Sequence, residues 1–153
     1  MRTLLFSLCI LSFGVWMVSC AGKAVQPPPQ AQAVYQENAI SLHFQADPQL
    51  NRYQNTAHAL HLCVYQLTTP NALKQYAGDS SGMGQLLQCS RFDPSVTMTK
   101  KVVMQPKTES TLVLDRAQGT RYVGIVAGYS NLDMNEAVDL MEIPVIEETT
   151  GWI

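Results

Sequence analysis

The sequence has few charged residues, and its basic residues do not cluster. Charged residues make up 14% of the 153-residue chain, whereas a typical soluble domain has about 25%. The longest basic run is the pair Lys100 and Lys101. A protein that binds nucleic acid needs a concentrated positive surface to neutralise phosphates. The composition therefore predicts no nucleic-acid partner and is typical of an exported, β-rich domain.

The sequence also lacks the motifs of common catalytic sites. It has no G-x-S-x-G nucleophile elbow, and the Gly-Met-Gly at residues 82–84 lacks the strand-to-helix setting of a phosphate-binding loop. His58, His61 and Cys63 resemble a metal-binding cluster, but no fourth ligand is evident and a disulfide would consume the thiol. We therefore predict no enzyme activity, no metal site and no cofactor.

Cysteine is scarce as well, with four in the chain. Cys9 lies in an N-terminal apolar run and Cys20 at its end, which leaves Cys63 and Cys89 for the domain. In an oxidising compartment this pair predicts a disulfide, which would stabilise the fold by on the order of 3 kcal/mol. Two separate buried thiols are the alternative, because the sequence does not test the distance between the two Cα atoms.

The chain begins with the pattern of an export signal. Arg2 supplies a positive charge, and residues 4–18 are apolar apart from two serines and a glycine. A membrane-spanning helix needs about 20 apolar residues, and this run is shorter. We predict that residues 1–19 are a signal peptide that is removed. The remaining 134 residues suffice for one domain.

The end of this run, Val18-Ser19-Cys20-Ala21, resembles the lipobox of bacterial lipoproteins, in which the cysteine becomes the first residue and carries the lipid. An ordinary signal would end in an A-x-A-like pattern instead. One acyl chain binds a membrane only marginally, but bacterial lipoproteins resemble one another in carrying three, palmitate among them. We predict lipidation of Cys20. Since Ala21 replaces the aspartate that retains enteric-type lipoproteins in the inner membrane, the resemblance implies the periplasmic face of the outer membrane.

A proline-rich segment follows, with Pro27, Pro28 and Pro29 in an uncharged background of Gln, Ala and Val. Such a segment is extended and semi-rigid, at about 3.1 Å per residue. We predict a tether over residues 20–38, which lifts a domain of residues 39–153 off the bilayer.

The domain begins with strand patterns. Ile40, Leu42 and Phe44 alternate with polar residues and predict a half-buried strand. Residues 60–67 and 122–129 are apolar on both faces and predict central strands. The glycines at 124 and 128 predict close approach of a facing layer.

The remaining segments are shorter. Residues 96–98 and 102–104 predict two strands separated by a bulge or turn, and residues 111–114 predict another strand. Residues 71–88 predict two short helical pieces outside the sheet, interrupted over 78–84. Asp133 and Glu136 form a capping-box-like pair that predicts a short helix, whereas residues 143–145 predict an edge strand. About seven β segments with one lateral helical insertion predict a small antiparallel β-sandwich.

This order of features resembles the outer-membrane lipoproteins of the type VI secretion system, the TssJ (SciN) family. The resemblance depends on the lipobox, on Val64-Tyr65-Gln66-Leu67, on the helical insertion and on Gly124-Ile125-Val126-Ala127. It implies a transthyretin-like β-sandwich that binds the periplasmic C-terminal part of the inner-membrane protein TssM.

In this family the loop between the first two strands is implicated in that contact. The resemblance therefore implies a partner-binding loop that contains the following residues: Asp47, Leu50, Asn51, Arg52 and Tyr53. Tyr and Arg are enriched at binding hot spots. The alternative for Leu50 is that it packs beneath the sandwich.

Two other functions stay open from the sequence. The chain could be a lipoprotein of another envelope secretion or assembly system, such as a pilotin or a type IV core lipoprotein. It could instead be a small-ligand-binding or enzymatic transthyretin-like domain, although no motif indicates the polar concave site that this requires.

Overall fold

The computed structural model describes residues 33–144. The predicted signal peptide, Cys20 and the proline-rich segment lie outside these residues. Within them the chain forms six strands and two short helices, in the following order: β1 (Gln36–Gln45), β2 (Leu60–Leu67), α1 (Asn71–Tyr76), α2 (Ser80–Leu86), β3 (Val96–Met104), β4 (Glu109–Arg116), β5 (Tyr122–Ala127) and β6 (Val138–Glu142).

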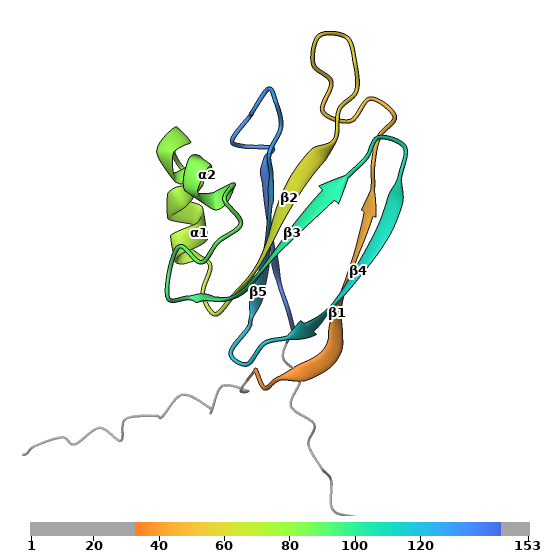
Figure 1. The fold of residues 1–153 in the computed structure, drawn as a ribbon. Coiled ribbons are helices and arrows are strands. Elements are labelled where there is room, and N and C mark those ends of the chain that lie inside the picture. Colours follow the sequence, from red (N-terminus) through yellow and green to blue (C-terminus); the bar gives the residue numbers. More distant parts are fainter. Residues whose placement is uncertain (1–32, 145–153) are drawn as a thin grey trace, which may run out of the picture. The chain divides into compact units, whose positions relative to one another are not determined.

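The strands form two antiparallel sheets. One has four strands in the order β3-β2-β5-β6, and the other consists of β1 and β4. The helices lie on one side of the four-stranded sheet and the β1–β4 pair lies on the other (Figure 1). The predicted fold class, mainly β with two sheets and a lateral helical insertion, is confirmed.

Strand β2 is the centre of the molecule, as its apolar sequence predicts. Every residue from Leu62 to Leu67 is buried. Tyr65 and Leu67 on one face pack in a cluster with Leu73 of α1 and Leu86 of α2. On the other face, Val64 packs in the cluster that joins the two sheets. A strand covered on both faces has no polar side, which is why β2 shows no alternation.

The prediction of two separate strands over residues 96–104 is wrong, because β3 is continuous from Val96 to Met104. The irregularity in its pairing with β2 lies near its start, where Gln66 pairs with Met98 and Leu67 with Val96. Lys100 does not interrupt the ladder. Since β3 is an edge strand of its sheet, an exposed lysine is tolerated in its middle.

The predicted helix near Asp133 is wrong. The Asp133 side chain accepts a hydrogen bond from Asn135 N at 2.9 Å, and its carbonyl accepts one from Ala137 N at 2.9 Å. These bonds form a turn, because a short carboxylate that bonds to the backbone two residues on competes with helix formation. The edge strand is β6, just before the predicted residues 143–145. Val145 lies outside the described residues.

The two predicted helices are present, but the interruption between them is shorter than predicted. Helix α2 includes both Gly82 and Gly84, so only residues 77–79 separate the helices. Asp79 is the N-cap of α2, and its side chain accepts a hydrogen bond from Gly82 N at 2.8 Å. The cap stabilises a helix whose glycines alone do not favour one.

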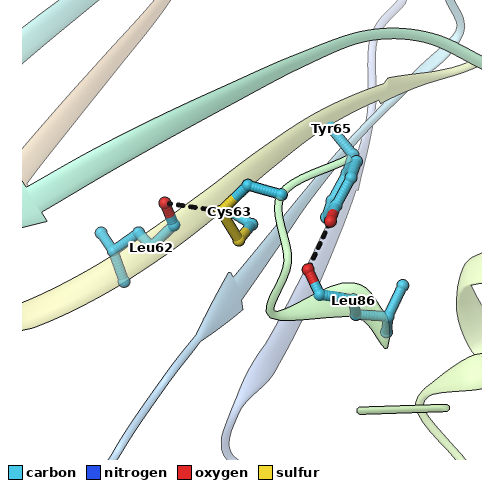
Figure 2. The surroundings of a disulfide bond; sticks show 5 residues. Leu62, Cys63, Tyr65 and Leu86 are labelled. Atoms are coloured by element: carbon cyan, nitrogen blue, oxygen red, sulfur yellow. Dashed lines mark hydrogen bonds between the residues drawn. A yellow bond between two sulfur atoms is a disulfide. The ribbon is translucent and has the colours of Figure 1, made fainter. Parts of the chain in front are cut away.

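A disulfide joins Cys63 of β2 to Cys89, which follows α2 (Figure 2). The two Cα atoms are 4.9 Å apart, within the usual range for a bridge. Next to it, the Tyr65 hydroxyl donates a hydrogen bond to the Leu86 carbonyl (Figure 2). Burial raises the pKa of Tyr65 to about 12. Both links hold the helical insertion against the central strand.

Candidate functional site

Three connections lie together at one end of the sheets, because the antiparallel strands that they join alternate in direction (Figure 1). They are the β1–β2 loop of residues 46–59, the β3–β4 turn of residues 105–108 and the β5–β6 loop of residues 128–137. The first is the predicted partner-binding loop.

The base of the β1–β2 loop is held by Leu50 and Asn51. Leu50 is partly buried and packs against the cluster that includes Leu60 and Ala127. The Asn51 amide donates a hydrogen bond to the Ala59 carbonyl at 3.0 Å, and its oxygen accepts one from Ser130 N at 2.7 Å. Asn51 therefore closes its own loop and connects it to the β5–β6 loop.

The tip of the loop is a tight hairpin. Tyr53 and Thr56 exchange two backbone hydrogen bonds of 2.9 and 3.0 Å. Gln54 and Asn55 between them have φ values of 47° and 65°, and two positive φ angles in a row are typical of a two-residue type I′ turn. This turn presents the side chain of Tyr53, which is 52% exposed.

The arginine of the loop is held by its neighbours. The Arg52 guanidinium donates hydrogen bonds to Gln49 Oε1, at 2.9 Å, and to Asn55 Oδ1. The Asp47 carboxylate accepts a hydrogen bond from Gln49 N at 2.6 Å and forms the first turn of the loop. Asp47 and Asn51 thus shape the loop, Leu50 attaches it to the core, and Arg52 and Tyr53 face solvent.

The β5–β6 loop adds exposed apolar residues that are not among the predicted partner-binding residues. Tyr129, Leu132 and Met134 are 37%, 38% and 37% exposed. Exposed apolar groups that gather at one place mark interaction surfaces. The signal in the sequence is the presence of the apolar residues Leu132 and Met134 between polar turn-forming residues.

The chain enters the domain at the opposite end. Gly119 N donates a hydrogen bond to the Ala33 carbonyl at 2.7 Å, and Arg116 Nε donates one to the Val34 carbonyl at 3.2 Å. The Asp115 carboxylate accepts a hydrogen bond from the backbone N–H of Asn38 and one from the Tyr35 hydroxyl, both at 2.9 Å. These two bonds lower the pKa of Asp115, whereas the contact with Asp115 raises the pKa of Tyr35.

The three residues that resemble a metal-binding cluster in the sequence have other partners. Cys63 is in the disulfide, the His61 ring packs beside Gly128, and His58 Nε2 lies 3.3 Å from the Tyr53 carbonyl oxygen. Between residues 33 and 144, no three His, Cys, Asp or Glu side chains are grouped so that they could hold a metal ion. Of the helices in this part of the chain, none has the length and hydropathy needed to cross a membrane.

Comparison with known proteins identifies the family. The sequence profile of the type VI secretion lipoproteins (VasD, EvfM, TssJ) matches residues 38–150. No curated protein sequence matches the chain.

Solved structures share the fold. The type VI lipoprotein TssJ1 of Pseudomonas aeruginosa is 21% identical, with a TM-score of 0.59 over 75% of this chain and 83% of that one. Lip of Serratia marcescens, described as a membrane-bound component of the type VI secretion system, is 24% identical, with a TM-score of 0.59 over 71% and 76%. A chain of the structure described as the TssM C-terminal domain (869–1107) from EAEC is 16% identical, with a TM-score of 0.56 over 72% and 85%. The chain therefore belongs to the type VI secretion lipoprotein family, TssJ (SciN), and is a scaffold component of a secretion system, not an enzyme.

Proposed function

We propose that the protein is anchored in the outer membrane by lipid on Cys20 and binds the periplasmic C-terminal domain of a TssM-like inner-membrane protein. The contact is made by what we term the loop-end surface, which consists of Arg52, Tyr53, Tyr129, Leu132 and Met134. The protein then acts as a scaffold that fixes the outer-membrane end of the secretion apparatus.

The observation that carries the proposal is the position of this surface relative to the start of the domain. Ala33 is bonded at one end of the sheets, and the loop-end surface lies at the other. Strand β1 runs between them, and its ten residues span about 33 Å at roughly 3.3 Å per residue. A lipid anchor before Ala33 would leave this surface free to reach a partner.

The chemistry of the surface fits a protein partner. It combines tyrosine, arginine and methionine, which are enriched in protein–protein interfaces. The hydrogen bonds of Asn51 and Arg52 hold the β1–β2 loop in one conformation, so that less conformational entropy is lost on binding. Chains of the same fold occur in a structure described as the TssM C-terminal domain and in one described as a type VI membrane complex. This occurrence supports TssM as the partner.

The experiment measures binding of the purified periplasmic domain of the TssM-like protein to the lipoprotein. Tyr53→Ala should weaken binding by tenfold or more, since a tyrosine hot spot contributes about 2 kcal/mol or more. Tyr35→Ala is the matched control, because Tyr35 is 53% exposed at the opposite end of the domain. It should leave the affinity unchanged.

Equal effects of the two substitutions would contradict the assignment of the loop-end surface. The anchor is tested separately by labelling cells with a palmitate analogue. The label should be present on the native chain and absent from Cys20→Ala, and a labelled Cys20→Ala protein would contradict lipidation at this residue.

A further inference from the structure

A groove of about 480 Å³ runs along one edge of β1. The residues from Ser41 to Ala46 form one wall, and Ile125 of β5 with Asp139 and Met141 of β6 contribute to the other. No described residue of β4 lines it. Among the described residues β1 pairs only with β4, so the groove follows the edge of β1 that has no neighbouring strand.

The pairing with β4 determines which backbone groups of β1 point into the groove. Ala46 N donates a hydrogen bond to the Thr108 carbonyl at 2.9 Å. In an antiparallel ladder every second residue bonds to the same neighbour, so Phe44 and Leu42 also bond toward β4. The residues between them direct their N–H and C=O groups to the opposite edge, where no described strand lies. These residues are Ser41, His43 and Gln45, and all three line the groove.

The opposite wall combines apolar side chains with carboxylates. Ile125 and Asp139 are partners in the β5–β6 ladder and therefore share one face of the sheet. Met141 lies on the same face, two residues further along β6, and is 37% exposed. Asp139 and Glu136 are exposed, and no Lys or Arg is among the described residues that line the groove. This wall is complementary to an apolar segment that carries a positive charge.

The groove is continuous with the loop-end surface. Tyr129 belongs to that surface and also lines the groove, as does Leu50 at the base of the β1–β2 loop. A partner on the loop-end surface can therefore extend a segment along β1. The five positions from Ser41 to Gln45 span about 17 Å at roughly 3.3 Å per residue, which is the length of a typical strand.

We propose that the TssM-like partner adds an extended segment to the free edge of β1 as a further strand; this inference rests on the proposed function. The segment bonds to the backbone of Ser41, His43 and Gln45. Its side chains that face β5 and β6 are apolar, with one Lys or Arg beside Asp139. In this mode of peptide binding, backbone hydrogen bonds supply affinity and alternate side chains supply specificity. The added strand also covers an edge that natural β-proteins usually protect.

The affinity of the full chain, purified in detergent, for the periplasmic domain of the TssM-like protein tests the charge. Asp139→Lys should weaken binding by about tenfold or more, because it brings two positive charges together. Glu37→Lys is the matched control, since it makes the same change of charge at an exposed position near the start of β1, outside the groove. It should leave the affinity unchanged. Equal weakening by both substitutions would reflect net charge alone and would overturn the proposal.

Hydrogen exchange tests the added strand itself and needs no variant. With saturating periplasmic domain, the backbone amides of Ser41, His43 and Gln45 should exchange about tenfold or more slowly than in the lipoprotein alone. The amides of Leu42 and Phe44, which bond to β4, should change little. Unchanged exchange at the first three amides would overturn the proposal. Slow exchange at these amides before the domain is added would assign the edge to another neighbour, such as a second copy of the chain, and would also overturn it.

Failure of this inference is distinguishable from failure of the proposed function. If Tyr53→Ala weakens binding and Asp139→Lys does not, the loop-end surface binds the partner and the added strand is wrong. If the native lipoprotein does not bind the periplasmic domain at all, both are contradicted.

Discussion

At the scale of single residues, Gln66 is a polar side chain that lies in the core. It is completely buried in β2. Its Nε2 donates a hydrogen bond to the Asp115 carbonyl at 2.7 Å, and its Oε1 accepts bonds from Ala117 N at 2.9 Å and from the Thr120 hydroxyl at 3.0 Å. One side chain thereby ties the four-stranded sheet to the end of β4, at the end of the domain where the chain enters.

We predict that Gln66→Leu lowers the free energy of unfolding by about 2 to 4 kcal/mol. The Asp115 carbonyl and the Ala117 N–H each lose their bond to Gln66, and the Thr120 hydroxyl keeps only its bond to Thr97. Urea denaturation followed by circular dichroism measures the change. Gln45→Leu is the control, because Gln45 makes only an exposed bond to the Glu109 side chain. It should change stability by less than about 0.5 kcal/mol. Similar losses in both variants would show that Gln66 has no special role.

Tyr65 predicts how stability depends on alkaline pH. Its pKa is raised from 10.0 to about 12 by burial. Above pH 10 the unfolded chain therefore loses this proton while the folded chain keeps it, so stability falls as pH rises from 10 toward 12. This one group contributes a slope of at most about 1.4 kcal/mol per pH unit.

Tyr65→Phe separates this effect from the titration of other groups. At neutral pH the variant should lose about 1 kcal/mol, because the Leu86 carbonyl loses the Tyr65 donor and keeps only its bond from Cys89 N. Between pH 9 and 11 its stability should fall less steeply than that of the native chain. Parallel profiles from urea denaturation at each pH would mean that Tyr65 does not control this dependence.

At the scale of elements, the two glycines of α2 have different surroundings. A Cβ at position 82 would collide with the Tyr76 carbonyl group, whereas a Cβ at position 84 would meet no atom within 4 Å. Gly82 thus permits α2 to pack closely against the end of α1.

We predict opposite outcomes for the same substitution at these positions. Gly84→Ala should raise the melting temperature, because alanine favours a helix over glycine by about 1 kcal/mol. Gly82→Ala should lower it, because the backbone of Tyr76 must move and α1 separates from α2. Differential scanning calorimetry measures both, and a stabilising Gly82→Ala would contradict the close packing.

The elements that could be predicted from the sequence are those with an unambiguous pattern. Strands β2 and β5 are covered on both faces and have continuous apolar sequences, so the sequence predicts their central positions in the sheet. Strand β6 could not be identified, because Asp133 resembles a helix cap while its side chain forms a turn. The alternation of Val138 and Leu140 with Asp139 and Met141 is also hard to recognise in the sequence, since Met141 is apolar although its side chain is 37% exposed.

At the scale of the whole molecule, the sequence predicts a loop between the first two strands but not which structural role each of its residues has. Asp47, Leu50 and Asn51 look like surface anchors in the sequence, yet they hold the loop in place. Tyr129, Leu132 and Met134 come from a distant segment. The pairing of β5 with β2 and the bond between Ser130 N and Asn51 bring them near residues 46–59, and no local pattern predicts which loops share one end of a sandwich.

The separation of the two ends leads to a prediction about the proline-rich segment. On the prediction that residues 20–38 form an extended tether, we expect deletion of residues 24–32 to bring the domain up to about 28 Å closer to the membrane, at roughly 3.1 Å per residue. We expect this deletion to reduce co-purification of the TssM-like protein from cells while leaving the affinity of the purified domains unchanged, because the loop-end surface is intact but displaced. A Pro-Ala segment of the same length is the control and should restore co-purification, since it supplies the same reach with a different sequence. If the shortened protein captured its partner in cells as well as the native one, the length of the tether would have no part in positioning the loop-end surface.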